Sequence, residues 1–172
     1  MKNTHGISNL LTFIQHVQDN GGGSYNMNTG DMNPKDGYFA SMQGHETIVN
    51  HLNEKTLFDF IKANVMSLTE EDKFIGAWDN DGRIHLDVSV KFDSKEEAIQ
   101  FGRDNAQIAI YDANEGKDII LADYFKARLE ELRTELRAER ISTGELLELQ
   151  SLAKYIEEGD VELLEAAGVP EN

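Results

Sequence analysis

A strand–turn–strand pattern between Phe74 and Phe92 constrains the fold of this chain more than any other segment. Apolar residues occupy every second position of the return strand: Ile84, Leu86, Val88, Val90 and Phe92. This period of two is typical of a half-buried antiparallel strand, because successive side chains point to opposite faces. The turn sequence Asn80–Gly82 joins the two halves with residues that favour a tight turn. The sequence therefore predicts a β-hairpin over residues 74–92.

Two further hairpins are predicted from turn residues. Segments 24–28 and 37–42 are expected to pair across an Asn- and Gly-rich connection, and 107–121 is expected to form a hairpin of its own. Helices are expected at 7–20, at 45–63 with room for a break near Asn53, and at 94–105. Helix and hairpin thus alternate three times. This order predicts an α+β domain, residues 1–121, in which an antiparallel sheet built from three hairpins has helices on one face.

Residues 122–172 are predicted to form a helical tail. A long helix over 123–140 is followed by a second helix, which the capping box Ser142–Glu145 opens, and by a short terminal helix. The long helix has a narrow apolar stripe: Phe125, Leu129, Leu132 and Leu136. Such a stripe suits one partner helix. Either the tail docks on its own α+β domain, or it forms a helical hairpin, a homodimer or a contact with another protein. From Glu145 onward the tail has eight acidic residues and one basic residue.

The charge of the whole chain limits its partners. Asp and Glu number 32 against 16 Lys and Arg, and the net charge is −16. Direct binding to nucleic acid is not expected, because phosphates are bound through Lys and Arg. The absence of cysteine excludes disulfides, thiolate metal sites and cysteine nucleophiles. The sequence has neither a signal-peptide core nor the roughly 20 apolar residues that cross a bilayer, so we expect a cytoplasmic protein without membrane contact.

Familiar catalytic and metal-binding motifs are incomplete in this sequence. Segments 31–37 and 79–82 have the acidic and glycine residues of a calcium loop in the wrong order. His45 and His51 are six residues apart, too far for a zinc-binding helix. Ser24 or Ser41 with His45 would be a nucleophile and base on sequence proximity alone. We therefore predict no cofactor, no metal and no catalytic residues.

Two sets of candidate binding residues remain. A polar and aromatic ligand patch would comprise Tyr25, Asn26, Asn28, Tyr38 and Trp78. The competing interpretation is that the aromatic residues belong to the core and the asparagines hold the turn. Acidic contacts to a protein partner would come from the tail residues Glu130, Glu131, Glu135, Glu148, Glu157 and Glu158.

Two segments carry a resemblance to known proteins. Residues 22–38 (GGSYNMNTGDMNPKDGY) and 141–171 (ISTGELLELQSLAKYIEEGDVELLEAAGVPE) are similar to segments of uncharacterised accessory proteins in phages and mobile elements of actinobacteria. The resemblance covers about a third of the chain and assigns no catalytic residue. It implies a small non-structural protein that binds a host or defence protein, as several acidic anti-restriction and anti-CRISPR proteins do.

These observations lead to three hypotheses of function. The first is a non-enzymatic, acidic interaction protein that binds a basic surface of a host or defence protein that handles nucleic acid. The second is a small-ligand-binding protein or small enzyme that uses the Asn- and Tyr-rich segment 20–46. The third is a self-assembling structural component.

Overall fold

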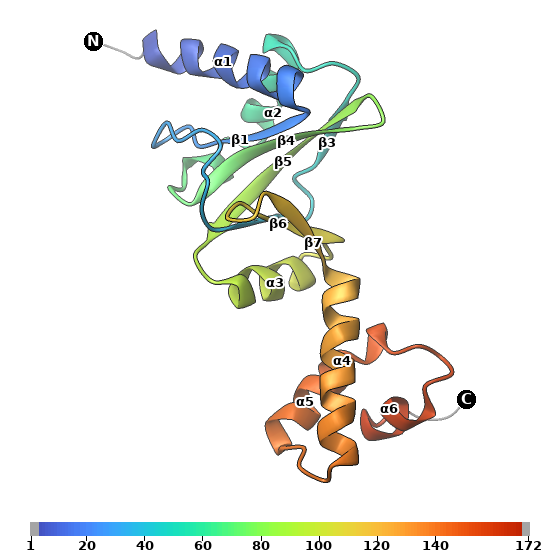
Figure 1. Ribbon diagram of the computed structural model, residues 1–172. Coiled ribbons are helices and arrows are strands. Elements are labelled where there is room, and N and C mark those ends of the chain that lie inside the picture. The colour runs from blue at the N-terminus through green and yellow to red at the C-terminus, as the bar shows by residue number, and fades with distance from the viewer. Residues whose placement is uncertain (1–3, 170–172) are drawn as a thin grey trace. The chain divides into compact units, whose positions relative to one another are not determined.

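The chain divides into two compact units, 1–119 and 120–172 (Figure 1). The computed structural model describes the backbone of residues 4–169 and the side chains of residues 8–169. Each unit has its own buried apolar residues. The units are therefore described separately.

The first unit is built on an antiparallel, curled sheet (Figure 1). Its strands are β1 Gly22–Tyr25, β2 Tyr38–Ser41, β3 Thr47–Val49, β4 Lys73–Asn80, β5 Arg83–Phe92, β6 Ala109–Asp112 and β7 Lys117–Ile120. Neighbouring strands follow the order β1-β4-β5-β2-β6-β7, and β3 pairs with β5 beside β2. The predicted α+β class with an antiparallel sheet is confirmed.

The central hairpin forms where the alternation and the turn residues predict it. Asn80 pairs with Arg83, and the two residues between them, Asp81 and Gly82, both have positive φ. Such a turn matches the twist of the flanking strands, and Asn, Asp and Gly adopt it at low cost. The Asp79 carboxylate also accepts a hydrogen bond from the N–H of Gly82 at 2.8 Å.

The predicted hairpin between segments 24–28 and 37–42 is wrong. β1 pairs with β4, whereas β2 pairs with β5 and β6, so the two strands are not neighbours in the sheet. The connecting segment instead folds back on β1 through a bridge between Tyr25 and Met32. The turn residues of this segment thus form a small turn at the sheet edge. β1 and β2 pair separately with the long central strands β4 and β5.

The predicted helix over 45–63 is also wrong in its first half. Residues 47–49 form β3, which pairs with β5, and only α2, Glu54–Ala63, is helical. Thr47, Ile48 and Val49 are β-branched and favour a strand. Asn53 starts the helix, because its side chain accepts a hydrogen bond from the N–H of Thr56 within a capping box.

The helices of this unit pack on the side of β5 that carries its even-numbered residues. Helix α1, Thr4–Asn20, and α2 enclose a core with β4 and β5; its most deeply buried members include Phe13, Leu57, Ile75, Leu86 and Val88. Helix α3, Lys95–Asp104, places Phe101 against Phe92, whose ring centroid is 5.1 Å away. The odd-numbered residues of β5 point to the opposite side, which we call the polar face: His85, Asp87 and Ser89, with Gly76 and Trp78 of β4.

The second unit is a small helical assembly. It comprises α4 Leu121–Arg137, α5 Thr143–Ser151, the single turn η2 Ala153–Tyr155 and α6 Val161–Ala166. Phe125, Leu129 and Leu132 of the predicted apolar stripe are buried, and α4 contacts α5 and η2. The Phe125 ring stacks on Tyr155, with centroids 4.6 Å apart. Most of the stripe is thus covered within this unit.

Candidate functional site

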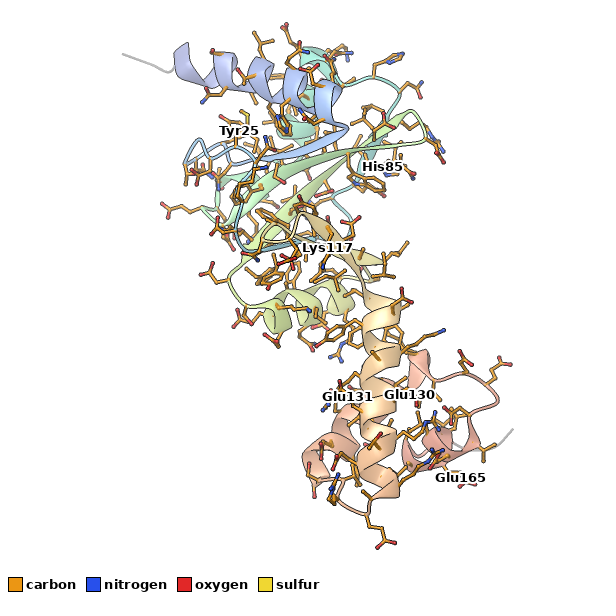
Figure 2. All side chains as sticks on the ribbon, viewed as in Figure 1. Tyr25, His85, Lys117, Glu130, Glu131 and Glu165 are labelled. Carbon is orange, nitrogen blue, oxygen red and sulfur yellow. The ribbon has the colours of Figure 1, made fainter. Side chains whose placement is uncertain are left out.

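The five residues of the predicted ligand patch do not meet on one surface. Tyr25 pairs with Ile75 and is buried, with its ring centroid 5.8 Å from that of Phe13 in α1 (Figure 2). Trp78 lies three positions further along β4 and faces the other side of the sheet. Tyr38 lies on β2, which is not a neighbour of β1.

The two asparagines of the patch hold the turn after β1. Asn26 is fully buried; its Oδ1 accepts hydrogen bonds from the N–H groups of Asn28 and Thr29, and its Nδ2 donates to the carbonyl of Glu71. Asn28 donates through Nδ2 to the carbonyl oxygens of Leu68 and Glu70, at 2.9 and 3.0 Å. These contacts match the interpretation that the asparagines hold the turn. Ligand binding by this segment stays a prediction.

Asn33 covers the outer edge of β1. Its backbone N–H donates to the carbonyl of Ser24 and its Oδ1 accepts from the N–H of Ser24, both at 2.8 Å. Asn33 has a φ of 51°, a conformation that Asn tolerates better than most residues. A side chain at Gly23 would collide with this arrangement, because its Cβ would lie 2.8 Å from Asn33 Oδ1. The segment therefore protects an edge strand from pairing with other chains.

The polar face contains a buried carboxyl group that the sequence did not reveal. Asp87 lies in the middle of β5, and Ser89 Oγ donates to its Oδ1 at 2.5 Å, while Ser41 supplies a second hydrogen bond. Burial raises the pKa of Asp87, and the serine hydroxyls oppose that shift. The alternation in β5 predicts that its polar residues face water. This prediction is wrong at Asp87 and Ser89, which are buried, whereas Arg83 at the start of the strand is exposed. The small residue Gly76 opposite Asp87 was the available signal.

His85 forms the second polar contact of this face. Its Nδ1 lies 2.7 Å from Glu46 Oε1, and its ring stacks on Trp78 at a centroid distance of 4.4 Å. The side chain of His85 is only 12 % exposed. Glu46 and Trp78 therefore cover most of this imidazole.

Trp78 is part of a row that crosses four strands. The β-sheet register aligns Gly22 of β1 with Trp78, Trp78 with His85, and His85 with Ile48 of β3. We call these four residues the Trp78 row. Trp78 is 44 % exposed and Ile48 is 47 % exposed. The row thus presents two large apolar side chains to solvent on either side of a histidine.

Five of the six predicted partner-binding glutamates form ion pairs within the second unit. The pairs are Glu130 with Arg133, Glu131 with Arg128, Glu135 with Arg140, Glu148 with Arg128 and Glu157 with Lys126. Glu130 and Glu131 are neighbours on α4 (Figure 2). Glu158 is exposed and forms no ion pair with the residues described, 4–169. The structure therefore separates Glu158 from the other five.

Arg133 links α4 to the segment before α6. Its side chain is 15 % exposed and contacts the carboxylates of Asp160, Glu162 and Glu130. The hydrogen bond from Arg133 lowers the pKa of Asp160. Asp160 also caps α6 by accepting a hydrogen bond from the N–H of Leu163. The basic residues of α4 thus hold the acidic segments that follow it.

Residues 4–169 show neither a metal-binding cluster nor a membrane-spanning helix. Among residues 4–169, no three side chains of the metal-binding kinds lie close enough together to hold an ion. None of the helices in this part of the chain combines the length and the apolar character that a bilayer crossing requires. Comparison with protein-family models, curated proteins and solved structures finds no match for this chain. The function is therefore argued from the chemistry of its surface.

Proposed function

We propose that the chain is a non-enzymatic, acidic interaction protein that binds a basic surface of a host or defence protein that handles nucleic acid. Its origin in a phage or mobile element belongs to the same proposal and rests on the resemblance of residues 22–38 and 141–171. In this proposal, carboxylates steer the partner and exposed apolar residues supply affinity.

One observation supports this proposal: most of the positive charge of the chain is used internally. Among the residues whose side chains the structure describes, 8–169, ten lysines and arginines lie within 4.0 Å of a carboxylate. Acidic residues still outnumber basic ones once the buried Asp87 and Asp112 are set aside, and the net charge of the chain is −16. In the second unit, Glu139, Glu158 and Glu165 are exposed, and Glu165 lies on α6 (Figure 2). A field of this sign attracts a basic surface and repels nucleic acid.

The test is capture of the partner at two salt concentrations. The tagged chain is incubated with a lysate of an actinobacterial host, and bound proteins are identified by mass spectrometry. We expect a basic, nucleic-acid-handling protein that binds at low salt and is released at high salt, since exposed charges are screened. A specific complex that is insensitive to salt would contradict the proposal.

Variants sharpen this test. Neutralising Glu139, Glu158 and Glu165 together to Gln should weaken capture without unfolding the tail, because all three are exposed. The matched control removes three carboxylates from the first unit, at Glu54, Asp93 and Glu97. If both triple variants lose the partner equally, net charge alone steers binding; if only the tail variant does, the tail carries the contact.

A further inference from the structure

The Trp78 row differs from the rest of the exposed surface in its chemistry. Trp78, the one tryptophan of the sequence, is neither a core residue nor an isolated surface residue. One neighbour across the strands, His85, stacks on its ring; the neighbour on the other side, Gly22, has no side chain. The indole is therefore held on one side and open toward β1.

Two exposed carboxylates lie beside the row. Glu46, just before β3, contacts His85, and Asp81 lies in the turn between β4 and β5, next to Arg83. Glu46 uses Oε1 to contact His85 and its side chain is 55 % exposed, so Oε2 can accept a further hydrogen bond. An aromatic face beside such carboxylates attracts a cation.

We propose that the Trp78 row is the docking site for an arginine side chain of the basic partner. The guanidinium stacks on the open side of Trp78, and the neighbouring carboxylates balance its charge. Arginine fits this site better than lysine, because its planar group stacks on aromatic rings and is more weakly hydrated than an ammonium group. The inference rests on the proposed function and names the surface that the partner contacts.

His85 positions the indole in this arrangement. The contact from Glu46 fixes the imidazole ring, and the fixed ring supports Trp78 from the side of β5. An indole held in one orientation loses little conformational entropy on binding. Ile48, exposed at the end of the row, offers an apolar surface to the part of the partner next to the arginine.

The experiment compares two blocked peptides of equal charge, octa-arginine and octa-lysine, neither of which contains tryptophan. Binding is measured at low salt by the anisotropy of a dye on the peptide, and the emission of Trp78 is recorded in parallel. We expect octa-arginine to bind about fivefold more tightly than octa-lysine, which is the order of one cation–π contact, and to quench the emission of Trp78.

Three variants test whether Trp78 is the origin of the preference for octa-arginine. Trp78→Ala should bind the two peptides with equal affinity, whereas Trp78→Phe should retain part of the preference, since Phe binds cations more weakly than Trp. Phe58→Ala, which removes another exposed aromatic residue on α2, should retain all of it. Thermal melts check that each variant is folded, and the peptide comparison on the unaltered chain does not depend on any variant.

Two results would overturn the inference. One is equal affinity of the unaltered chain for the two peptides; the other is an arginine preference that survives in a folded Trp78→Ala variant. A captured partner that is sensitive to salt but indifferent to Trp78→Ala would overturn the docking site and leave the proposed function standing. A captured partner that is insensitive to salt would instead contradict the proposed function.

Discussion

Gly76 and Asp87 face each other across β4 and β5, and the carboxyl group of Asp87 fills the space that a side chain at position 76 would need. A Cβ atom at Gly76 would lie 2.5 Å from Asp87 Oδ1. The φ of Gly76 is not positive, so the requirement for glycine is steric. The buried carboxyl group of Asp87 therefore requires a glycine at position 76 on the polar face.

This relationship predicts a strong coupling between the two positions. Gly76→Ala alone should destabilise the first unit by about 1–3 kcal/mol, the usual cost of overpacking. In an Asp87→Ala background the same change should cost almost nothing, because the opposing carboxyl is gone. Urea denaturation of the four chains in a double-mutant cycle measures the coupling. Additive effects would show that the two residues do not share this space.

Asp87→Asn should change how stability depends on pH. The pKa of Asp87 is raised in the folded chain, so between the unfolded and folded pKa values the folded state binds more protons, and stability falls as pH rises. Asn cannot ionise and escapes this loss. We expect the free energy of unfolding of Asp87→Asn relative to the unaltered chain to increase as pH rises from about 4. A difference that is constant with pH would contradict the raised pKa.

Asn26→Ala should destabilise the first unit by about 1–3 kcal/mol, because it leaves the carbonyl of Glu71 and two turn N–H groups without their partner. Chemical denaturation checks this. Thr29→Ala is the control in the same turn; Thr29 is exposed, and we expect a change of less than about 0.5 kcal/mol. Equal effects of the two variants would show that the turn does not depend on Asn26.

Asp160→Asn tests the contact with Arg133 separately from the helix cap. Asn is as good a capping residue as Asp, so the substitution removes mainly the charge. The pKa of Asp160 is lowered in the folded chain, so its contribution to stability is present above the unfolded pKa of about 4 and is lost as pH falls through the folded value. We expect Asp160→Asn to lower the melting temperature at pH 7 and to have little effect at pH 2. An equal effect at both values would indicate a loss of packing or of the cap.

The fold was predictable where a local pattern fixes the structure. The alternation from Ile84 to Phe92 and the turn at Asn80–Gly82 predict β4 and β5 because both signals lie within one segment. The partners of β1 and β2 were not predictable, because pairing across some 50 residues leaves no mark in a local pattern. The segment of β3 combines β-branched residues, which favour a strand, with an apolar spacing that continues into α2 and favours a helix. Pairing with β5 makes this segment a strand.

The candidate site was less predictable than the fold. The residue types of Trp78 and Asn26 drew attention in the sequence, but the side of the sheet that each faces depends on the register. Asp87 and His85 look like ordinary solvent-facing residues until Ser41, Glu46 and Trp78 cover them. The pair of Arg128 and Glu131 follows from helical spacing, whereas that of Arg128 and Glu148 needs the tertiary structure.

The glutamates of the tail divide into two groups, and substitution should distinguish them. Glu148 accepts two hydrogen bonds from Arg128, both at 2.9 Å, so Glu148→Gln should destabilise the second unit by about 0.5–1 kcal/mol, the range of a well-oriented surface pair. Glu158→Gln should leave stability unchanged, because Glu158 is exposed and forms no ion pair with the described residues, and should act only on partner binding. Thermal melts and capture of the partner are measured for both variants. If Glu158→Gln unfolds the tail, or if Glu148→Gln leaves its stability untouched, the division between structural and contact carboxylates is wrong.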